Sequence, residues 1–117
     1  MLDLKKRLHQ SKAQRKLTPG TYTSKVVEVR WAANYAPEEA YEIIYDVTAD
    51  GKVYQYREIF FTNRRNIRTS NFEDYLANND IAYLDDFVGK TEELTFENVE
   101  ASNGNTYLNI TNRVFIK

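Results

Sequence analysis

The sequence predicts a mainly β domain in which five strands form a small barrel and one short helix lies between the third and fourth strands. Three observations predict this fold class. Apolar and polar residues alternate through most of the chain after residue 20, as in strands with one buried face. Two Gly-containing pairs, Asp50-Gly51 and Asn103-Gly104, are typical of two-residue hairpin turns. The alternation breaks between residues 63 and 88, where a helix is expected.

The expected strands are rich in Thr, Val, Ile and aromatic residues, which favour strands. In the first strand, the adjacent Val26 and Val27 interrupt the alternation, which predicts either a bulge or a strand that serves two cores. The first three strands are expected to form a meander, and the last two a hairpin. The five predicted strands are Gly20–Trp31, Ala40–Thr48, Lys52–Thr62, Glu92–Val99 and Thr106–Ile116.

The segment between the third and fourth strands is expected to contain a short helix over residues 72–78, capped by Ser70 or Asn71. Phe72 and Leu76 lie four residues apart, on one face of such a helix. The apolar residues that follow predict either a second helical turn or an irregular packed segment, which Gly89 ends. These apolar residues are Ile81, Leu84, Phe87 and Val88.

The order βββ-α-ββ is that of an OB-fold, in which five antiparallel strands close into a barrel and the helix plugs one end. Closure is the simplest way for so small a sheet to bury both of its edges. Two other architectures remain open at this point. An SH3-like barrel normally lacks the long helical insert, and an open α+β sheet would leave the two edge strands unpaired.

Composition and charge narrow the class of protein. The chain has 117 residues, 42% of them hydrophobic, enough for a single core. It contains no cysteine and one histidine, His9, which excludes disulfides, thiol catalysis and a two-histidine zinc site within one chain. Neither a membrane span nor a signal peptide is evident, so a cytoplasmic location is expected.

Charge is unevenly distributed along the chain. Residues 1–17 hold six lysines and arginines against one aspartate, a net charge of +5. The domain expected over residues 18–117 holds the other ten bases and sixteen acids, a net charge of −6. We interpret residues 1–17 as a flexible arm or frayed helix. Such a basic arm indicates a polyanion partner, although a solvated tail without a partner has the same composition.

The sequence does not favour an enzyme. The adjacent acidic pairs Asp85-Asp86 and Glu92-Glu93 are poor candidates for acid–base catalysis, because neighbouring residues in a strand point to opposite faces. The chain contains no nucleophile elbow, phosphate-binding glycine loop or zinc-protease motif. We therefore expect no catalytic activity, cofactor, metal or small-molecule substrate.

Short motifs in the domain resemble a family of binding proteins. The opening residues 19–29 (PGTYTSKVVEV), the segment 86–90 (DFVGK) and the segment 103–110 (NGNTYLNI) are similar to small single-stranded-DNA-binding proteins of phages and mobile elements. The resemblance covers residues 19–117. It implies an OB-fold, binding of single-stranded DNA during replication or recombination, and possible homo-oligomers. The chain lacks the acidic Pro/Gly-rich tail through which bacterial single-strand binders recruit other proteins.

Single-strand binding needs aromatic faces for the bases and basic side chains for the phosphates. OB-folds display them on the second and third strands and in adjoining loops, where this chain is rich in Tyr and Arg. We thus predict sequence-independent binding of single-stranded DNA, with RNA left open; the alternative is a protein–protein adaptor or structural module on the same barrel. Tyr41 and Tyr45 could equally be core residues, and the arginine cluster a solvated loop. The predicted binding residues are Arg30, Trp31, Tyr35, Lys52, Tyr54, Tyr56, Arg57, Arg64, Arg65 and Arg68.

Overall fold

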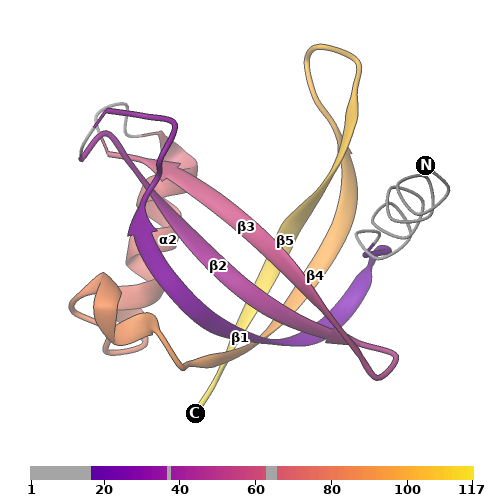
Figure 1. The fold of residues 1–117 in the computed structure, drawn as a ribbon, viewed down its shortest axis with the longest axis horizontal. Helices are drawn as coiled ribbons and strands as arrows, with labels where there is room; N and C mark the ends of the chain where they lie inside the picture. The colour runs from indigo at the N-terminus through magenta and orange to yellow at the C-terminus, as the bar shows by residue number, and fades with distance from the viewer. Residues whose placement is uncertain (1–16, 37, 63–65) are drawn as a thin grey trace, which may run out of the picture.

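The computed structural model describes residues 17–36, 38–62 and 66–117 (Figure 1). The predicted basic arm up to residue 16, with His9, and two predicted binding residues, Arg64 and Arg65, lie outside these ranges. The described chain contains five strands, one α-helix and one short 3₁₀ helix. They are β1 (Gly20–Trp31), β2 (Ala40–Ala49), β3 (Lys52–Phe61), α2 (Ile67–Asn78), η1 (Leu84–Phe87), β4 (Thr91–Glu100) and β5 (Thr106–Ile116).

The five strands form one antiparallel sheet in the order β3-β2-β1-β4-β5. β1 lies at its centre and is bent along its length, while α2 lies at one end of the curved sheet (Figure 1). The prediction of a mainly β fold with five strands and a helix between the third and fourth is confirmed.

The sheet is not closed into a barrel, so that part of the prediction is not confirmed. β3 and β5 are its two edges, and no strand pairing joins them in the described part of the chain. Side chains occupy the space between these edges instead: the Tyr56 hydroxyl donates to the Leu108 carbonyl, 2.9 Å away. Paired strands lie about 4.8 Å apart, which leaves no room for side chains between them. The observed sheet corresponds to the open alternative.

The central strand β1 contains a bulge at the adjacent valines, close to the point where it meets the segment before β4. The register between β1 and β2 shifts between Val26 and Glu28, which confirms the predicted bulge. At the same point, Val26 exchanges backbone hydrogen bonds with the segment before β4: its N–H donates to Lys90 O at 2.9 Å, and its carbonyl accepts from Gly89 N at 2.8 Å. The bulge therefore lies where the pairing of β1 with β4 ends, while its pairing with β2 continues to Trp31.

The helix begins earlier than predicted. Its N-cap is Asn66, whose side-chain oxygen accepts a hydrogen bond from the Thr69 backbone N–H at 2.9 Å. Ser70 and Asn71, the predicted caps, lie inside the helix. The segment after the helix ends in the 3₁₀ turn η1 rather than in a second α-helical turn, and it buries Phe87 completely.

The core lies between the inner face of the curved sheet and α2. On β2, the alternating residues Tyr41, Ile43, Tyr45 and Val47 are all buried, so the tyrosines of this strand are core residues. Across the core, the rings of Phe60 and Phe72 stack with centroids 4.2 Å apart and planes 8° apart. This contact joins β3 to α2 and holds the helix on the sheet.

Candidate nucleic-acid interface

The alternation of β3 divides the predicted binding residues between two faces of the sheet. Tyr54 and Tyr56 share the inner face with the buried residues Glu58 and Phe60. Arg57 lies on the outer face, where it is exposed. The eight predicted residues that the structure describes therefore do not form one surface.

One group of predicted residues does gather on the outer face, at the end of β3. We call Arg30, Tyr35, Arg57, Ile59 and Phe61 the outer patch. Tyr35, 38% exposed, meets Phe61 edge-on, with ring centroids 5.0 Å apart and planes 88° apart. In the strand register, Arg30 on β1 pairs with Glu42 on β2, and Glu42 pairs with Ile59 on β3. Arg57 lies two residues before Ile59, on the same face of β3.

Backbone hydrogen bonds hold Tyr35 in the outer patch. The loop between β1 and β2 is closed at its base by the Ala32 N–H, which donates to Ala40 O at 2.9 Å. It is tied to the end of β3 by the Thr62 N–H, which donates to Glu39 O at 2.9 Å. The aromatic ring of the loop is therefore positioned on the strand that carries Arg57.

Only one of the two arginines of the outer patch has a positive charge that acidic neighbours do not neutralise. Arg30 Nε donates to Glu42 at 2.8 Å, and its Nη1 lies 3.4 Å from Glu28, so acidic neighbours neutralise it. The Glu42 hydrogen bond is the main reason why the pKa of Arg30 is raised. Arg57 forms no ion pair with another described residue, which leaves it as the cation available to a phosphate.

Lys52 and Tyr54, two further predicted binding residues, lie away from the outer patch. Lys52 pairs with Ala49 at the turn between β2 and β3, at the opposite end of the strand from Phe61. At about 3.3 Å per residue, nine residues separate these ends by about 30 Å. Tyr54 is half-buried on the inner face.

Tyr56 is half-buried and already has partners within the fold, while its predicted part in binding stays a prediction. Its ring packs edge-on against Phe96, with centroids 4.9 Å apart, and its hydroxyl donates to Leu108 O. Burial, followed by the charge of Glu58, raises the pKa of Tyr56 to about 12. The hydroxyl therefore keeps the proton that it donates to β5.

Trp31 lies at the end of β1 and is 51% exposed. It does not join the outer patch but lines a hollow of about 370 Å³ with Tyr83, which is 74% exposed, and Leu84. This hollow is a second exposed aromatic surface, next to η1.

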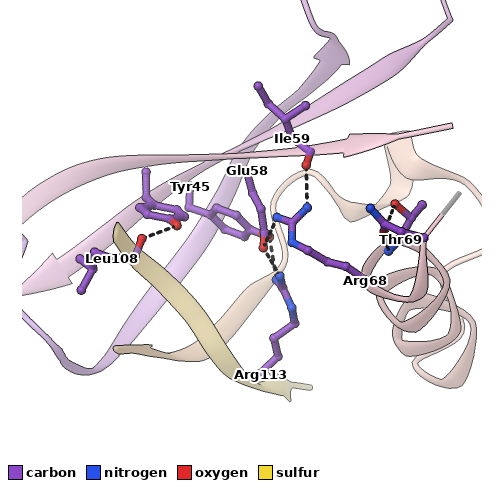
Figure 2. Close-up of polar contacts among 9 residues, drawn as sticks. Tyr45, Glu58, Ile59, Arg68, Thr69, Leu108 and Arg113 are labelled. Carbon is purple, nitrogen blue, oxygen red and sulfur yellow. Dashed lines mark hydrogen bonds and ion pairs between the residues drawn. The ribbon is translucent and has the colours of Figure 1, made fainter. Parts of the chain in front are cut away.

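A cluster of charged residues that was not predicted from the sequence lies in the seam between β3 and β5 (Figure 2). Glu58 is 5% exposed and accepts hydrogen bonds from two guanidinium groups, those of Arg113 on β5 and Arg68 on α2. Arg113 Nη1 also donates to the Tyr45 hydroxyl at 2.9 Å, and that hydroxyl donates to Glu58 at 3.0 Å. Three strands and the helix are thus joined through one carboxylate.

Aromatic rings support both arginines of this cluster. The Arg68 guanidinium lies 4.2 Å from the Phe60 ring centroid, and the Arg113 guanidinium lies 4.9 Å from that of Phe72. Arg68 was predicted to bind nucleic acid, but it lies in this seam rather than on the outer patch. Its Nη1 donates to Ile59 O at 2.7 Å. The signal in the sequence was a glutamate and an arginine at inward-facing positions of β3 and β5.

A second buried carboxylate, Glu92, lies on the inner face of β4. The Tyr75 hydroxyl donates to its Oε2 at 2.6 Å. Its Oε1 and the hydroxyl of Ser24, its register partner on β1, have no hydrogen-bond partner among the described residues. Burial raises the pKa of Glu92 above the ordinary value, against the opposing effects of Tyr75 and Arg113.

Folding raises the pKa of Glu92, so the folded state favours the neutral carboxyl group. The stability that depends on Glu92 is therefore fully present below the unfolded pKa, near 4.5, and is lost as pH rises through the folded pKa. Glu92→Gln removes this titration. We expect the variant to gain stability over the wild type as pH rises above about 4.5. The gain should level off once pH exceeds the folded pKa of Glu92, because the carboxylate is then charged in both the folded and the unfolded state. Urea unfolding across the pH range measures it.

Glu93→Gln is the matched control, because Glu93 is the exposed neighbour of Glu92 on β4. Its difference from the wild type should not follow the same curve. A Glu92→Gln variant whose stability stays parallel to the wild type at every pH would contradict the proposed titration.

Other classes of site receive no support from the described residues. Within these residues, no group of three or more His, Asp or Glu side chains could hold a metal ion. Among the helices described, none has the length and apolar character needed to cross a membrane.

Comparison with protein families, curated proteins and solved structures finds no significant match to this chain.

Proposed function

We propose that the protein binds single-stranded DNA without sequence preference, along the outer patch. The observation that supports this proposal most directly is the contact between Tyr35 and Phe61. It presents a partly exposed ring on the same face of β3 as Arg57, which has no ion pair with another described residue. Stacking on an aromatic ring tolerates any base, and an arginine can contact the phosphates. Phosphate contacts carry no sequence information, which agrees with binding that ignores sequence.

We further propose that the sheet is an OB-like barrel left open between β3 and β5. The order of the elements and the pairing of β1 with both β2 and β4 support this relation. OB-folds bind single strands across their second and third strands, and the outer patch lies over the ends of these strands. The basic charge of residues 1–17 would add attraction for a polyanion.

Tyr35→Ala is expected to weaken binding of oligo-dT by about 1–3 kcal/mol, the contribution of one stacked base. The measurement is fluorescence anisotropy at low ionic strength, with an oligonucleotide that lacks terminal phosphates. Tyr107→Ala is the matched control, since Tyr107 is also an exposed tyrosine, 48%, but lies on β5. It should bind as the wild type does.

Arg57→Gln tests the phosphate contact separately. Loss of one contact should flatten the slope of log affinity against log salt concentration by about 0.7, the value for a single strand. Tyr35→Ala should leave this slope nearly unchanged, because stacking releases no counterion. Equal affinity of the wild type and both variants would remove the outer patch from the binding surface.

The hollow lined by Trp31, Tyr83 and Leu84 supports a second candidate function, a protein–protein adaptor. Its lining is mainly apolar, with Arg30 and Asp85 as its charged members, and the rings of Trp31 and Tyr83 are exposed. Aromatic residues of this kind are enriched in protein interfaces. A wild-type protein that fails to bind oligo-dT at low salt would favour this alternative.

A further inference from the structure

The seam between β3, α2 and β5 contains a groove that the proposed function does not use. We call it the seam groove; its volume is about 480 Å³, within the range of small-molecule sites. Eleven residues line it, and its charged members are Arg68, Arg113 and Glu58. Two positive charges and one negative charge leave the lining with a net charge of +1.

The two guanidinium groups have hydrogen-bonding capacity to spare. Each guanidinium carries five N–H donors. Within the described residues, Arg113 uses donors on Tyr45 and Glu58, and Arg68 uses donors on Ile59 and Glu58. Further N–H groups remain on both side chains, and both side chains line the groove.

The cluster also holds these donors in place before any ligand arrives. Glu58 fixes both arginines from one side, while Phe60 and Phe72 pack under their planes. The Arg113 side chain is only 15% exposed. Binding an anion would therefore cost little side-chain entropy, and the low local dielectric strengthens the interaction.

Other lining residues add to the preference for an anion. The first turn of α2 borders the groove through Ile67 and Arg68, and it contains no acidic residue. The Asn71 side chain offers an amide donor on the next turn of the same helix. Phe72 and Tyr75 supply an apolar wall beside the charged groups.

We propose that the seam groove is a binding site for a phosphate monoester, such as the phosphate of a nucleotide. Arg68 and Arg113 approach from different elements, so their free donors can reach different oxygens of one ligand. A phosphate monoester presents three terminal oxygens to two guanidiniums, whereas a carboxylate presents two. The aromatic wall leaves room for the attached base.

This site is independent of the outer patch, because the inner and outer faces of β3 separate the two. The proposal can therefore fail without affecting strand binding, and the reverse is also true. Two sources of the ligand share this chemistry: a free nucleotide and the terminal phosphate of a DNA strand.

The test measures binding of inorganic phosphate by calorimetry at constant low ionic strength. Glu58→Gln removes the competing negative charge and keeps a hydrogen-bond acceptor for the arginines. It should tighten phosphate binding about tenfold, the effect of one charge-assisted interaction. Arg68→Gln, at a side chain 50% exposed, should weaken binding by a similar factor. Lys25→Gln, at an exposed lysine of β1 outside both the groove and the outer patch, is the matched control and should leave phosphate affinity unchanged.

A purely structural charge cluster would not produce tighter phosphate binding when its carboxylate is removed. The proposal is overturned if the wild type does not bind phosphate, or if folded Glu58→Gln and Arg68→Gln both bind it with wild-type affinity. Two further titrations identify the source. Preference for thymidine monophosphate over inorganic phosphate indicates a free nucleotide. Arg68-dependent preference for 5′-phosphorylated over unphosphorylated oligo-dT indicates a strand end.

Discussion

Replacing Arg113 with methionine is expected to lower the free energy of unfolding by about 3–5 kcal/mol, as when one partner is removed from a buried ion pair. Glu58 is 5% exposed and receives a hydrogen bond from the Arg113 guanidinium. Among the described residues, the variant would leave Glu58 with only Arg68, which is half-exposed, as its ionic partner. Methionine preserves much of the arginine stem volume, so the loss reports mainly on the unpaired charge.

The double variant Glu58→Gln with Arg113→Met separates charge from packing. It removes both charges of the pair, and we expect it to recover at least half of the stability lost in Arg113→Met. Urea unfolding at neutral pH measures the double variant and both single variants, and Arg57→Met serves as the exposed-arginine control. If the double variant loses the sum of the two single losses, the carboxylate and the guanidinium are not coupled and the seam is held by other contacts.

Much of the fold could be predicted from short-range signals. The pair Asp50-Gly51 adopts positive φ angles of 52° and 76°, as its hairpin requires. The adjacent Val26 and Val27 marked the bulge, next to which the pairing of β1 with β4 ends. Each signal depends on a few consecutive residues, so it could be recognised without knowledge of the rest of the molecule.

Closure of the sheet could not be predicted in the same way. It depends on whether β3 and β5, which are more than forty residues apart in the chain, approach to pairing distance. Glu58 and Arg113 meet across this seam, and the sequence around either residue does not indicate that the two form an ion pair. Large side chains such as Tyr56 keep the two edges apart, an outcome set by packing across the whole core.

The sequence predicted which types of residue make up the candidate site, but not which individual residues lie together on one face. Tyr and Arg on the second and third strands pointed to a single-strand binding surface, but the assignment of each residue depended on the face it occupies. On β3, a shift of one position moves a side chain from the outer patch to the core. Tyr56 and Arg57 are neighbours in the chain, yet one bonds to β5 and the other is exposed.

The adjacent residues Phe60 and Phe61 offer the sharpest test of the assignment of side chains to the inner and outer faces of β3. Phe60 is fully buried, and its ring stacks on Phe72 and lies under the Arg68 guanidinium. Phe60→Ala is expected to lower the free energy of unfolding by about 3–5 kcal/mol, because it leaves a cavity in the core. Phe61 is half-buried on the outer patch, so Phe61→Ala should cost only about 1 kcal/mol.

The effects on DNA binding should be the reverse of those on stability. Phe61 supports the Tyr35 ring, so Phe61→Ala should weaken binding of oligo-dT while the protein stays folded. Phe60→Leu, which keeps the core filled, should bind oligo-dT as the wild type does. Thermal unfolding and anisotropy on the same preparations measure both properties. If Phe61→Ala keeps full affinity while Phe60→Leu loses it, the inner face of β3 rather than the outer patch would carry the binding.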